Sequence, residues 1–283
     1  MNPPMSRRQF LAVAATVAAA PAVLAADDKD FGGFILGIQS YTFRNFDLEP
    51  ALKRTKDLGL KYAEFYQKHC PVTTNPDQIK AFLKLCKDYD ITPFSFGVQR
   101  FTKNHDDNKK FFEFGKLLGI KNFSADPDPD SFDSLDKLCA EYKIAIAIHP
   151  HGPAGKGQHR WYSADVILKA VKDHHPLIGT CLDTGHLIRS EQLGEKLVPE
   201  EEVKKMGARN FGMHLKDHDN KRKTDVVYGK DGGVLNVPAV LKALKDVKFT
   251  GTISIEYEAN PNDPSKDVAA CIEIFKESVK KLA

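Results

Sequence analysis

Short apolar runs alternate with longer stretches of mixed polarity along most of the chain. Each run has the length of a strand, and polar side chains follow its last hydrophobic residues. Such runs are typical of buried strands in a parallel sheet. The sequence therefore predicts eight strands, at Phe34–Gln39, Tyr62–Phe65, Thr92–Val98, Asn122–Ala125, Ala145–His149, Ile178–Asp183, Phe211–Lys216 and Thr252–Glu256.

Helical patterns lie between the predicted strands, with apolar residues three and four positions apart. The clearest one follows Ser163, a residue type that often caps the N-terminus of a helix. Gly59 and Gly119 can end two other helices in a left-handed conformation. The predicted helices are Glu49–Asp57, Gln78–Asp88, Asn108–Leu118, Ser131–Glu141, Ser163–Asp173, Pro238–Leu244 and Ala269–Val279.

This alternation predicts the fold class. Eight strand–helix units over about 250 residues indicate an α/β protein with a closed (β/α)8 TIM barrel. A doubly wound open sheet is the alternative. It would place a phosphate-binding glycine fingerprint after the first strand, and none follows Gln39.

The N-terminal segment has a different pattern and is set apart from the barrel. Residues 6–11 read SRRQFL, a twin-arginine motif, and an uncharged, alanine-rich stretch follows. Small residues near Ala25 offer a cleavage site, and the apolar stretch is too short to span a bilayer. We therefore predict a twin-arginine signal peptide at residues 1–25, a barrel domain at 26–283, and export to the periplasm. An ordinary membrane anchor or an amphipathic first helix is the alternative.

The charge of the predicted mature chain is close to neutral. The whole sequence has 41 basic and 38 acidic residues, so removal of Arg7 and Arg8 leaves 39 basic residues and a net charge of +1. This balance gives no reason to expect nucleic acid or an acidic lipid surface as a partner. No later segment is apolar enough for a stable membrane anchor, and homo-oligomerisation is left open.

The five cysteines are scattered, and their spacing matches neither a zinc motif nor a disulfide framework. Three of them lie in apolar surroundings, which predicts buried thiols, with one disulfide as the alternative.

Candidate chemistry gathers at the ends of the later strands. In a parallel barrel the carboxyl ends of the strands converge on one face, where carboxylates and imidazoles can surround one ion. Such a ligand set suits manganese, zinc, cobalt or iron better than calcium. A cap for Asp183 and a core position for His214 are the structural alternatives. The candidates at these strand ends are His149, His151, Asp183, His186, His214, Lys216, Asp217 and Glu256.

Two long connections follow the fifth and seventh predicted strands, where a barrel keeps its working loops. Residues 151–162 are rich in glycine and carry Trp161, which either stacks on a sugar ring or fills the barrel rim. Residues 217–237 are polar and also contain several glycines.

Four motifs together resemble those of xylose isomerase-like barrels of the sugar phosphate isomerase/epimerase family. They are HPHGP at 149–153, LDTGH at 182–186, HLKD at 214–217 and SIEYE at 254–258. The resemblance covers essentially the whole predicted mature chain and implies a TIM barrel that binds one divalent metal. By motif, the implied metal ligands are His149, Asp183, His214 and Glu256.

The resemblance also implies substrate contacts. These come from His186 and Lys216, and Glu64 matches a glutamate often found in that pocket. Ketose epimerases of this family carry a glutamate where this chain has His149, which puts a two-base epimerisation in doubt. His151 is then a second ligand or a substrate contact.

The expected function is an exported, metal-dependent isomerase or epimerase that forms an enediolate from a ketose or keto-sugar. The metal would polarise a carbonyl, Glu256 or Glu64 would remove the adjacent proton, and Lys216, His186 or His151 would return it. A lyase or hydrolase of oxidised glycosides and a non-catalytic sugar-binding barrel are the alternatives. A DNA endonuclease of the same superfamily is disfavoured, because no Asp-x-His pair follows the seventh strand.

Overall fold

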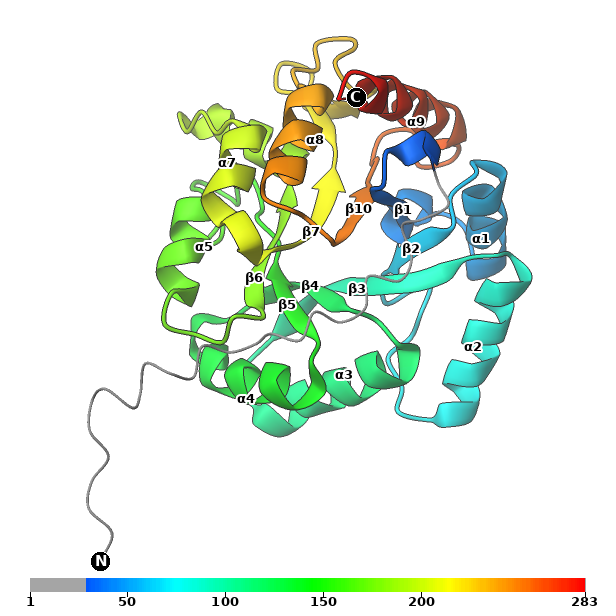
Figure 1. The fold of residues 1–283 in the computed structure, drawn as a ribbon, viewed down its shortest axis with the longest axis vertical. Helices are drawn as coiled ribbons and strands as arrows, with labels where there is room; N and C mark the ends of the chain where they lie inside the picture. The colour runs from blue at the N-terminus through cyan, green and yellow to red at the C-terminus, as the bar shows by residue number, and fades with distance from the viewer. Residues whose placement is uncertain (1–28, 283) are drawn as a thin grey trace, which may run out of the picture.

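The computed structural model describes residues 29–282 and places eight parallel strands in a closed barrel (Figure 1). The order around the barrel is β1-β10-β7-β6-β5-β4-β3-β2. The prediction of a TIM barrel is therefore confirmed. The twin-arginine segment predicted for residues 1–25 lies outside the described residues. The barrel strands are β1 (Ile35–Gln39), β2 (Tyr62–Phe65), β3 (Thr92–Phe101), β4 (Asn122–Pro127), β5 (Ala145–Ile148), β6 (Ile178–Asp183), β7 (Asn210–Leu215) and β10 (Thr252–Ile255).

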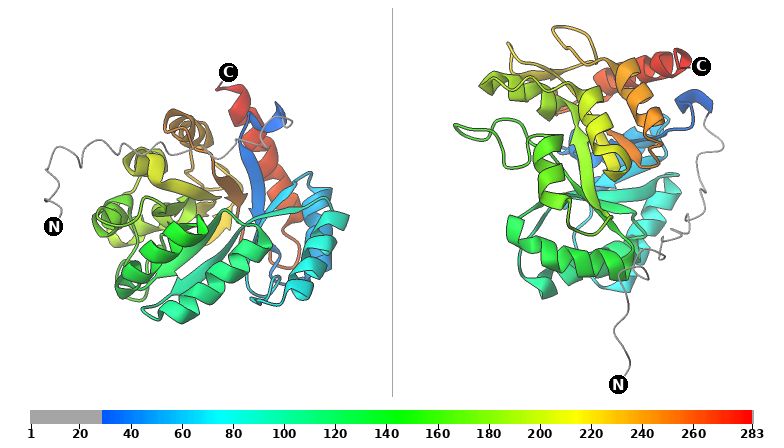
Figure 2. Two further views of the ribbon diagram at one scale, coloured as in Figure 1. Left: turned by 60° about the horizontal axis from the view of Figure 1, so that its bottom comes forward. Right: turned by 60° about the vertical axis from the view of Figure 1, so that its left-hand side comes forward.

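Helices surround the barrel and bury their apolar faces against it (Figures 1 and 2). Asparagine side chains cap two of them: Asn75 accepts from the N–H of Asp77 and Asn104 accepts from that of Asp106. The α-helices are α1 (Leu48–Asp57), α2 (Pro76–Asp88), α3 (His105–Leu118), α4 (Phe132–Tyr142), α5 (Ala164–Val171), α6 (Thr184–Arg189), α7 (Pro199–Met206), α8 (Val237–Asp246) and α9 (Ser265–Lys280). Within residues 29–282, none of the helices could cross a bilayer.

Shorter elements fill the connections. Five 3-10 helices are described: η1 (Lys29–Phe31), η2 (Ser40–Phe43), η3 (Pro129–Ser131), η4 (Ser190–Leu193) and η5 (Gly207–Arg209). The long segment after β7 forms an antiparallel hairpin of β8 (Asp217–Asp219) and β9 (Thr224–Val226).

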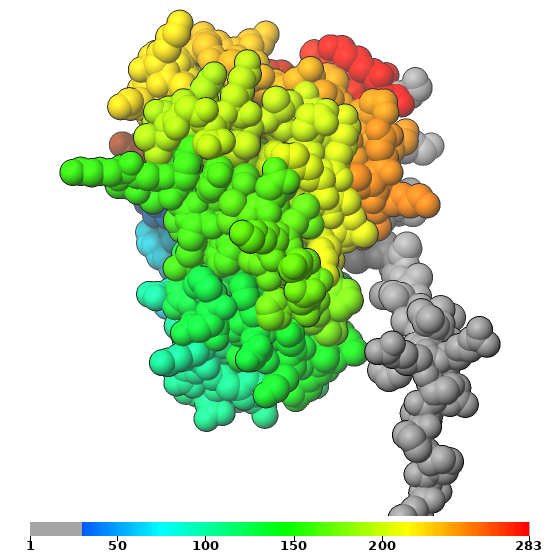
Figure 3. All heavy atoms as spheres, turned by 90° about the vertical axis from the view of Figure 1, so that its left-hand side faces the viewer, coloured from blue at the N-terminus to red at the C-terminus, as the bar shows by residue number. Residues whose placement is uncertain are grey.

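The sequence analysis missed α6, α7 and this hairpin. The side chain of Asp217 holds the segment in place, because it accepts hydrogen bonds from the backbone N–H groups of Gly229, Val234 and Leu235. The connection after β5 lacks such an anchor at its tip. Residues 154–157 are exposed, and the segment projects from the molecule (green in Figure 3).

The core contains all five cysteines as free, buried thiols, which confirms the prediction made for Cys139, Cys181 and Cys271. Aromatic rings dominate the packing beside β3 and β4. Phe96, Phe101, Phe112 and Phe123 lie fully or almost fully buried and pack with ring centroids between 5.5 and 6.2 Å apart. These edge-to-face and tilted contacts form a dense, rigid layer between this side of the barrel and α3.

Candidate metal centre

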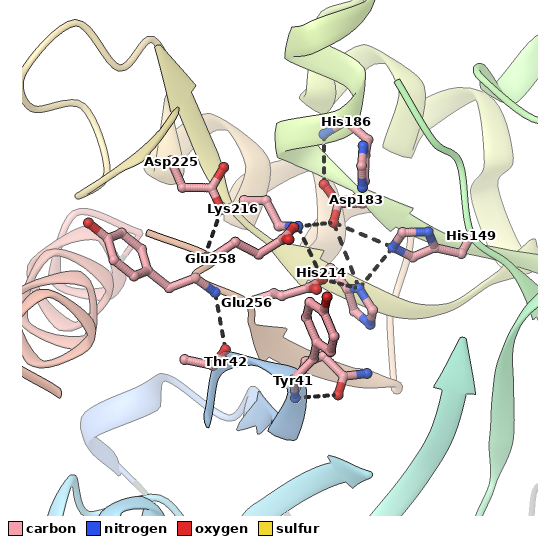
Figure 4. A network of polar contacts seen from close by, with 12 residues as sticks. Tyr41, Thr42, His149, Asp183, His186, His214, Lys216, Asp225, Glu256 and Glu258 are labelled. Carbon is pink, nitrogen blue, oxygen red and sulfur yellow. Dashed lines mark hydrogen bonds and ion pairs between the residues drawn. The ribbon is translucent and has the colours of Figure 1, made fainter. Parts of the chain in front are cut away.

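The four implied metal ligands meet at the carboxyl end of the barrel (Figure 4). His149 follows β5 directly, Asp183 ends β6, His214 lies on β7 and Glu256 follows β10 directly. These strands are neighbours in the order β10-β7-β6-β5. One ligand atom from each of the four side chains lies within 4.8 Å of the others.

Strand register explains why side chains so distant in sequence come together. Asp183 pairs with His214 across β6 and β7, and Ser254 pairs with His214 across β10 and β7. Glu256 lies two residues beyond Ser254, so strand alternation turns it toward the same side.

The contacts among the four side chains converge on one point. His149 Nε2 lies 2.9 Å from His214 Nδ1 and 3.4 Å from Asp183 Oδ2. Glu256 Oε2 lies 2.9 Å from His214 Nδ1. The Oδ2 atom of Asp183 is buried and accepts no hydrogen bond. A buried carboxylate oxygen without a hydrogen bond is costly, and two carboxylates with two imidazoles form a donor set that fits a divalent transition metal.

Lys216 lies beside the four side chains and is almost fully buried. Its Nζ atom is 3.4 Å from Asp183 Oδ2, 3.3 Å from Glu256 Oε2 and 2.7 Å from Glu258 Oε1. Burial lowers the pKa of a lysine, but the carboxylates of Asp183 and Glu256 outweigh burial and hold the pKa of Lys216 well above its ordinary value. Lys216 therefore remains a cation at neutral pH.

The same pairing keeps the carboxylates ionised. Burial raises the pKa of a carboxyl group, yet Lys216 together with the nearby histidines outweighs burial at both Asp183 and Glu256 and lowers both pKa values. Both side chains are therefore available as anionic ligands.

His186 adjoins this cluster through both its backbone and its ring. Its N–H donates to Asp183 Oδ1 at 2.7 Å, and its Nδ1 accepts from the N–H of Gly152 at 3.0 Å. Arg189 Nη1 lies 3.3 Å from the same Nδ1. Burial holds the pKa of His186 well below its ordinary value, so the ring is neutral and carries its proton on Nε2.

His151 lies against the rings of His149 and His186, with centroids 4.7 and 4.9 Å away. Its Nδ1 is buried without a hydrogen-bond partner. Burial, followed by the nearby His149, lowers the pKa of His151 to about 3. His151 is therefore a neutral imidazole at the edge of the cluster. The three rings do not form a second metal site, because His186 Nδ1 is occupied and its Nε2 carries the proton.

Glu64 lies on β2, and its side chain is buried inside the barrel. Its carboxylate accepts from Gln39 Nε2 at 2.7 Å and Ser95 Oγ at 2.8 Å, and it also bonds Ser124 Oγ. His214 Nε2 lies 3.0 Å from Glu64 Oε1. These partners surround both carboxylate oxygens, so the structure does not place Glu64 as a free base at the mouth of the barrel.

The structure does not bring Trp161 to the site. Its side chain is buried, its indole N–H donates to the carbonyl of Pro127 at 3.0 Å, and its ring packs against Phe132. Of the two roles considered for Trp161, filling the barrel rim matches this position.

Sequence reasoning missed several residues around the cluster. Glu258 could have been found, because it lies two positions beyond Glu256 within the SIEYE motif. Gln39 ends the first strand, which is a weaker signal. Ser95 and Ser124 could not have been found, because nothing near them in the sequence sets them apart from the other serines of the chain.

Fold and cluster together define an α/β barrel with a histidine and carboxylate centre at the carboxyl ends of its strands. A family model described as a xylose isomerase-like TIM barrel matches residues 52–277. The chain belongs to this family. No curated protein matches the sequence.

Solved structures share the architecture. An uncharacterised protein from Parabacteroides distasonis is 29% identical, with a TM-score of 0.66 over 88% of this chain and 99% of that one. A D-psicose 3-epimerase from Clostridium cellulolyticum is 14% identical, with a TM-score of 0.65 over 87% of this chain and 99% of that one. A D-allulose 3-epimerase from a Methylomonas species is 15% identical, with a TM-score of 0.65 over 87% and 98% of the two chains. At such identities the two epimerases are similar in fold alone.

Proposed function

We propose that the protein is a divalent-metal-dependent isomerase or epimerase that acts on a ketose or keto-sugar through an enediolate. The observation that carries this proposal is the convergence of His149, Asp183, His214 and Glu256 within 4.8 Å, with Asp183 Oδ2 left without a hydrogen bond. The likeness in fold to sugar 3-epimerases supports a carbohydrate as substrate.

These four side chains would hold the metal, and manganese, zinc, cobalt and iron all suit them. A divalent cation bound there would polarise a carbonyl and its neighbouring hydroxyl and so lower the cost of removing the proton between them.

Glu256 is assigned as the base. Its pKa is lowered by Lys216, so it is an anion at neutral pH, and it lies at the end of β10 facing the cluster. Lys216 stays charged and would stabilise negative charge that develops on a substrate oxygen. Glu64 is not assigned to proton transfer, because its oxygens are already hydrogen-bonded.

Two neutral histidines are assigned to the substrate. His186 carries its proton on Nε2 and can donate to a substrate oxygen, and His151 can accept or return a proton. If the proton returns to the opposite face of the same carbon the reaction is an epimerisation, and if it returns to the neighbouring carbon the reaction is an isomerisation.

Elimination from an oxidised glycoside is the second candidate. It is favoured by the histidine at position 149, because only Glu256 and Asp183 supply carboxylates to the metal cluster and Glu64 is enclosed. Elimination needs a single base, which removes one proton before a group on the next carbon departs. Epimerisation by two opposed carboxylates does not fit the carboxylates of this cluster.

The experiment that tests the proposal is an NMR assay of the metal-loaded protein in heavy water, with free ketoses and keto-glycosides as substrates. Isomerisation or epimerisation predicts a rearranged sugar that has gained solvent deuterium, and elimination predicts an unsaturated product with a released leaving group. A rearranged sugar without solvent deuterium would contradict the enediolate route, and release of the leaving group without an unsaturated product would contradict elimination. Binding without turnover would indicate the non-catalytic barrel.

Export to the periplasm is part of the same proposal. It is supported by the SRRQFL motif at residues 6–11. Replacement of Arg7 and Arg8 by lysine should leave the protein inside the cell, as measured by fractionation, and unchanged export would contradict this part of the proposal.

A further inference from the structure

We propose that Glu64 is a positioning residue of the metal centre, which holds the ring of His214 so that Nδ1 faces the other three ligands. This inference rests on the metal-dependent function proposed above. It assigns to Glu64 a role different from proton transfer.

The contact crosses the inside of the barrel. Glu64 lies on β2 and His214 on β7, and these strands are not neighbours in the barrel order. Glu64 Oε1 and His214 Nε2 nevertheless lie 3.0 Å apart, and both side chains are buried. A direct contact between such distant strands requires that both side chains reach into the centre of the barrel.

The proton on the His214 ring follows from this contact. An ionised carboxylate only accepts hydrogen bonds, so Nε2 must donate to Glu64. In a neutral imidazole the lone pair then lies on Nδ1, the atom that is 2.9 Å from Glu256 Oε2 and 2.9 Å from His149 Nε2. A carboxylate behind a metal-binding histidine fixes the tautomer and raises the basicity of the ligand.

Three further strands hold Glu64 in this orientation. Gln39 on β1, Ser95 on β3 and Ser124 on β4 all donate hydrogen bonds to its carboxylate. The donors also explain why a buried anion is tolerated there, since each charge-assisted hydrogen bond offsets part of the cost of desolvation. Glu64 is thus fixed by one half of the barrel and acts on a ligand in the other half.

The test is Co²⁺ binding by the full-length protein, measured by competition with a chelator and by the visible absorption spectrum of the ion. Glu64→Gln keeps the size of the side chain and removes its charge. We expect Co²⁺ to bind the variant about 10- to 100-fold more weakly and with an altered spectrum.

Glu202→Gln is the matched control. Glu202 is as buried as Glu64, but it accepts from the N–H of Ala164 and lies away from the metal ligands. The loss of stability that follows from neutralising a buried glutamate should appear in Glu202→Gln as well. Its Co²⁺ affinity should nevertheless stay within about twofold of that of the unmodified protein.

Three results separate the inference from the function on which it rests. Equal Co²⁺ affinity in Glu64→Gln and the unmodified protein overturns the role of Glu64 alone. No Co²⁺ binding by the unmodified protein overturns the proposed metal centre and this inference with it. If Glu64→Gln does not fold, Ser95→Ala replaces it: a several-fold loss of affinity supports the inference and unchanged affinity overturns it.

Discussion

The two halves of the molecule are packed with different side chains. Outside β3 and β4, phenylalanine rings pack on one another between these strands and α3, as Phe101, Phe112 and Phe123 do. At the carboxyl ends of β5, β6, β7 and β10 the side chains are instead histidines, carboxylates and Lys216. The aromatic half supplies rigidity, and the charged half supplies the groups that can hold an ion. A site with fixed geometry needs both, because a ligand set is only as well positioned as the packing that supports it.

The largest effect is expected in the charged half, from Asp183→Ala. This change removes the carboxylate whose Oδ2 has no hydrogen-bond partner. The remaining three ligands should therefore bind metal more than about 100-fold more weakly, a larger loss than is expected when a residue that only contacts a ligand is replaced. Elemental analysis after dialysis measures the result. Full metal occupancy in the variant would show that the ligands lie elsewhere.

Phe112→Ala tests the aromatic half. The ring is fully buried and packs 5.5 Å from Phe123, so its loss should destabilise the fold by about 3–5 kcal/mol. Urea unfolding measures this change. The metal affinity of the folded variant should stay within about twofold of that of the unmodified protein. A loss of metal affinity together with the loss of stability would mean that the aromatic half also determines metal binding.

His151 provides a pH-dependent test within the charged half. Its folded pKa of about 3 lies below the ordinary value of 6.5, so between these values the unfolded chain binds a proton that the folded protein does not. His151 therefore makes stability fall as the pH drops through this window.

In His151→Gln this contribution is absent. Relative to the unmodified metal-free protein, the variant should gain about 2 kcal/mol in the free energy of unfolding between pH 7 and pH 5. Urea titrations at the two pH values measure the free energy of unfolding of both proteins. If the variant and the unmodified protein differ by the same amount at pH 7 and pH 5, His151 takes up its proton in the folded protein as it does in the unfolded chain.

The smallest effect is expected from Trp161→Phe at the rim. Loss of the indole N–H leaves the carbonyl of Pro127 without its donor, which should cost about 1 kcal/mol of stability. Because the ring is buried away from the ligands, KM should change by less than about twofold. A large rise in KM would instead indicate that the Trp161 side chain stacks on the sugar ring of the substrate.

The charged half was the easier one to predict from sequence. All eight strands were placed by their apolar runs, and residues such as Asp183 and Glu256 stand out because they interrupt those runs at the strand ends. That these strand-end side chains lie close together could then be predicted from the geometry of parallel barrels. The short helices α6 and α7 were missed because their apolar spacing spans too few residues to give a periodic signal.

Contacts across the barrel could not be predicted from the sequence. The partnership of Glu64 with His214 depends on two strands 150 positions apart in sequence, and nothing local distinguishes a glutamate that supports a ligand from one that meets substrate. The burial of Trp161 likewise depends on Pro127 and Phe132, which belong to another strand–helix unit. Such roles are set by tertiary packing, so the residue types alone left both open.

The most direct test of the metal centre is anomalous diffraction from crystals of the protein soaked in Mn²⁺ or Co²⁺. The account predicts one strong peak within bonding distance of His149 Nε2, Asp183 Oδ2, His214 Nδ1 and Glu256 Oε2. A peak bound by other residues, or crystals that take up no ion at this position, would contradict it.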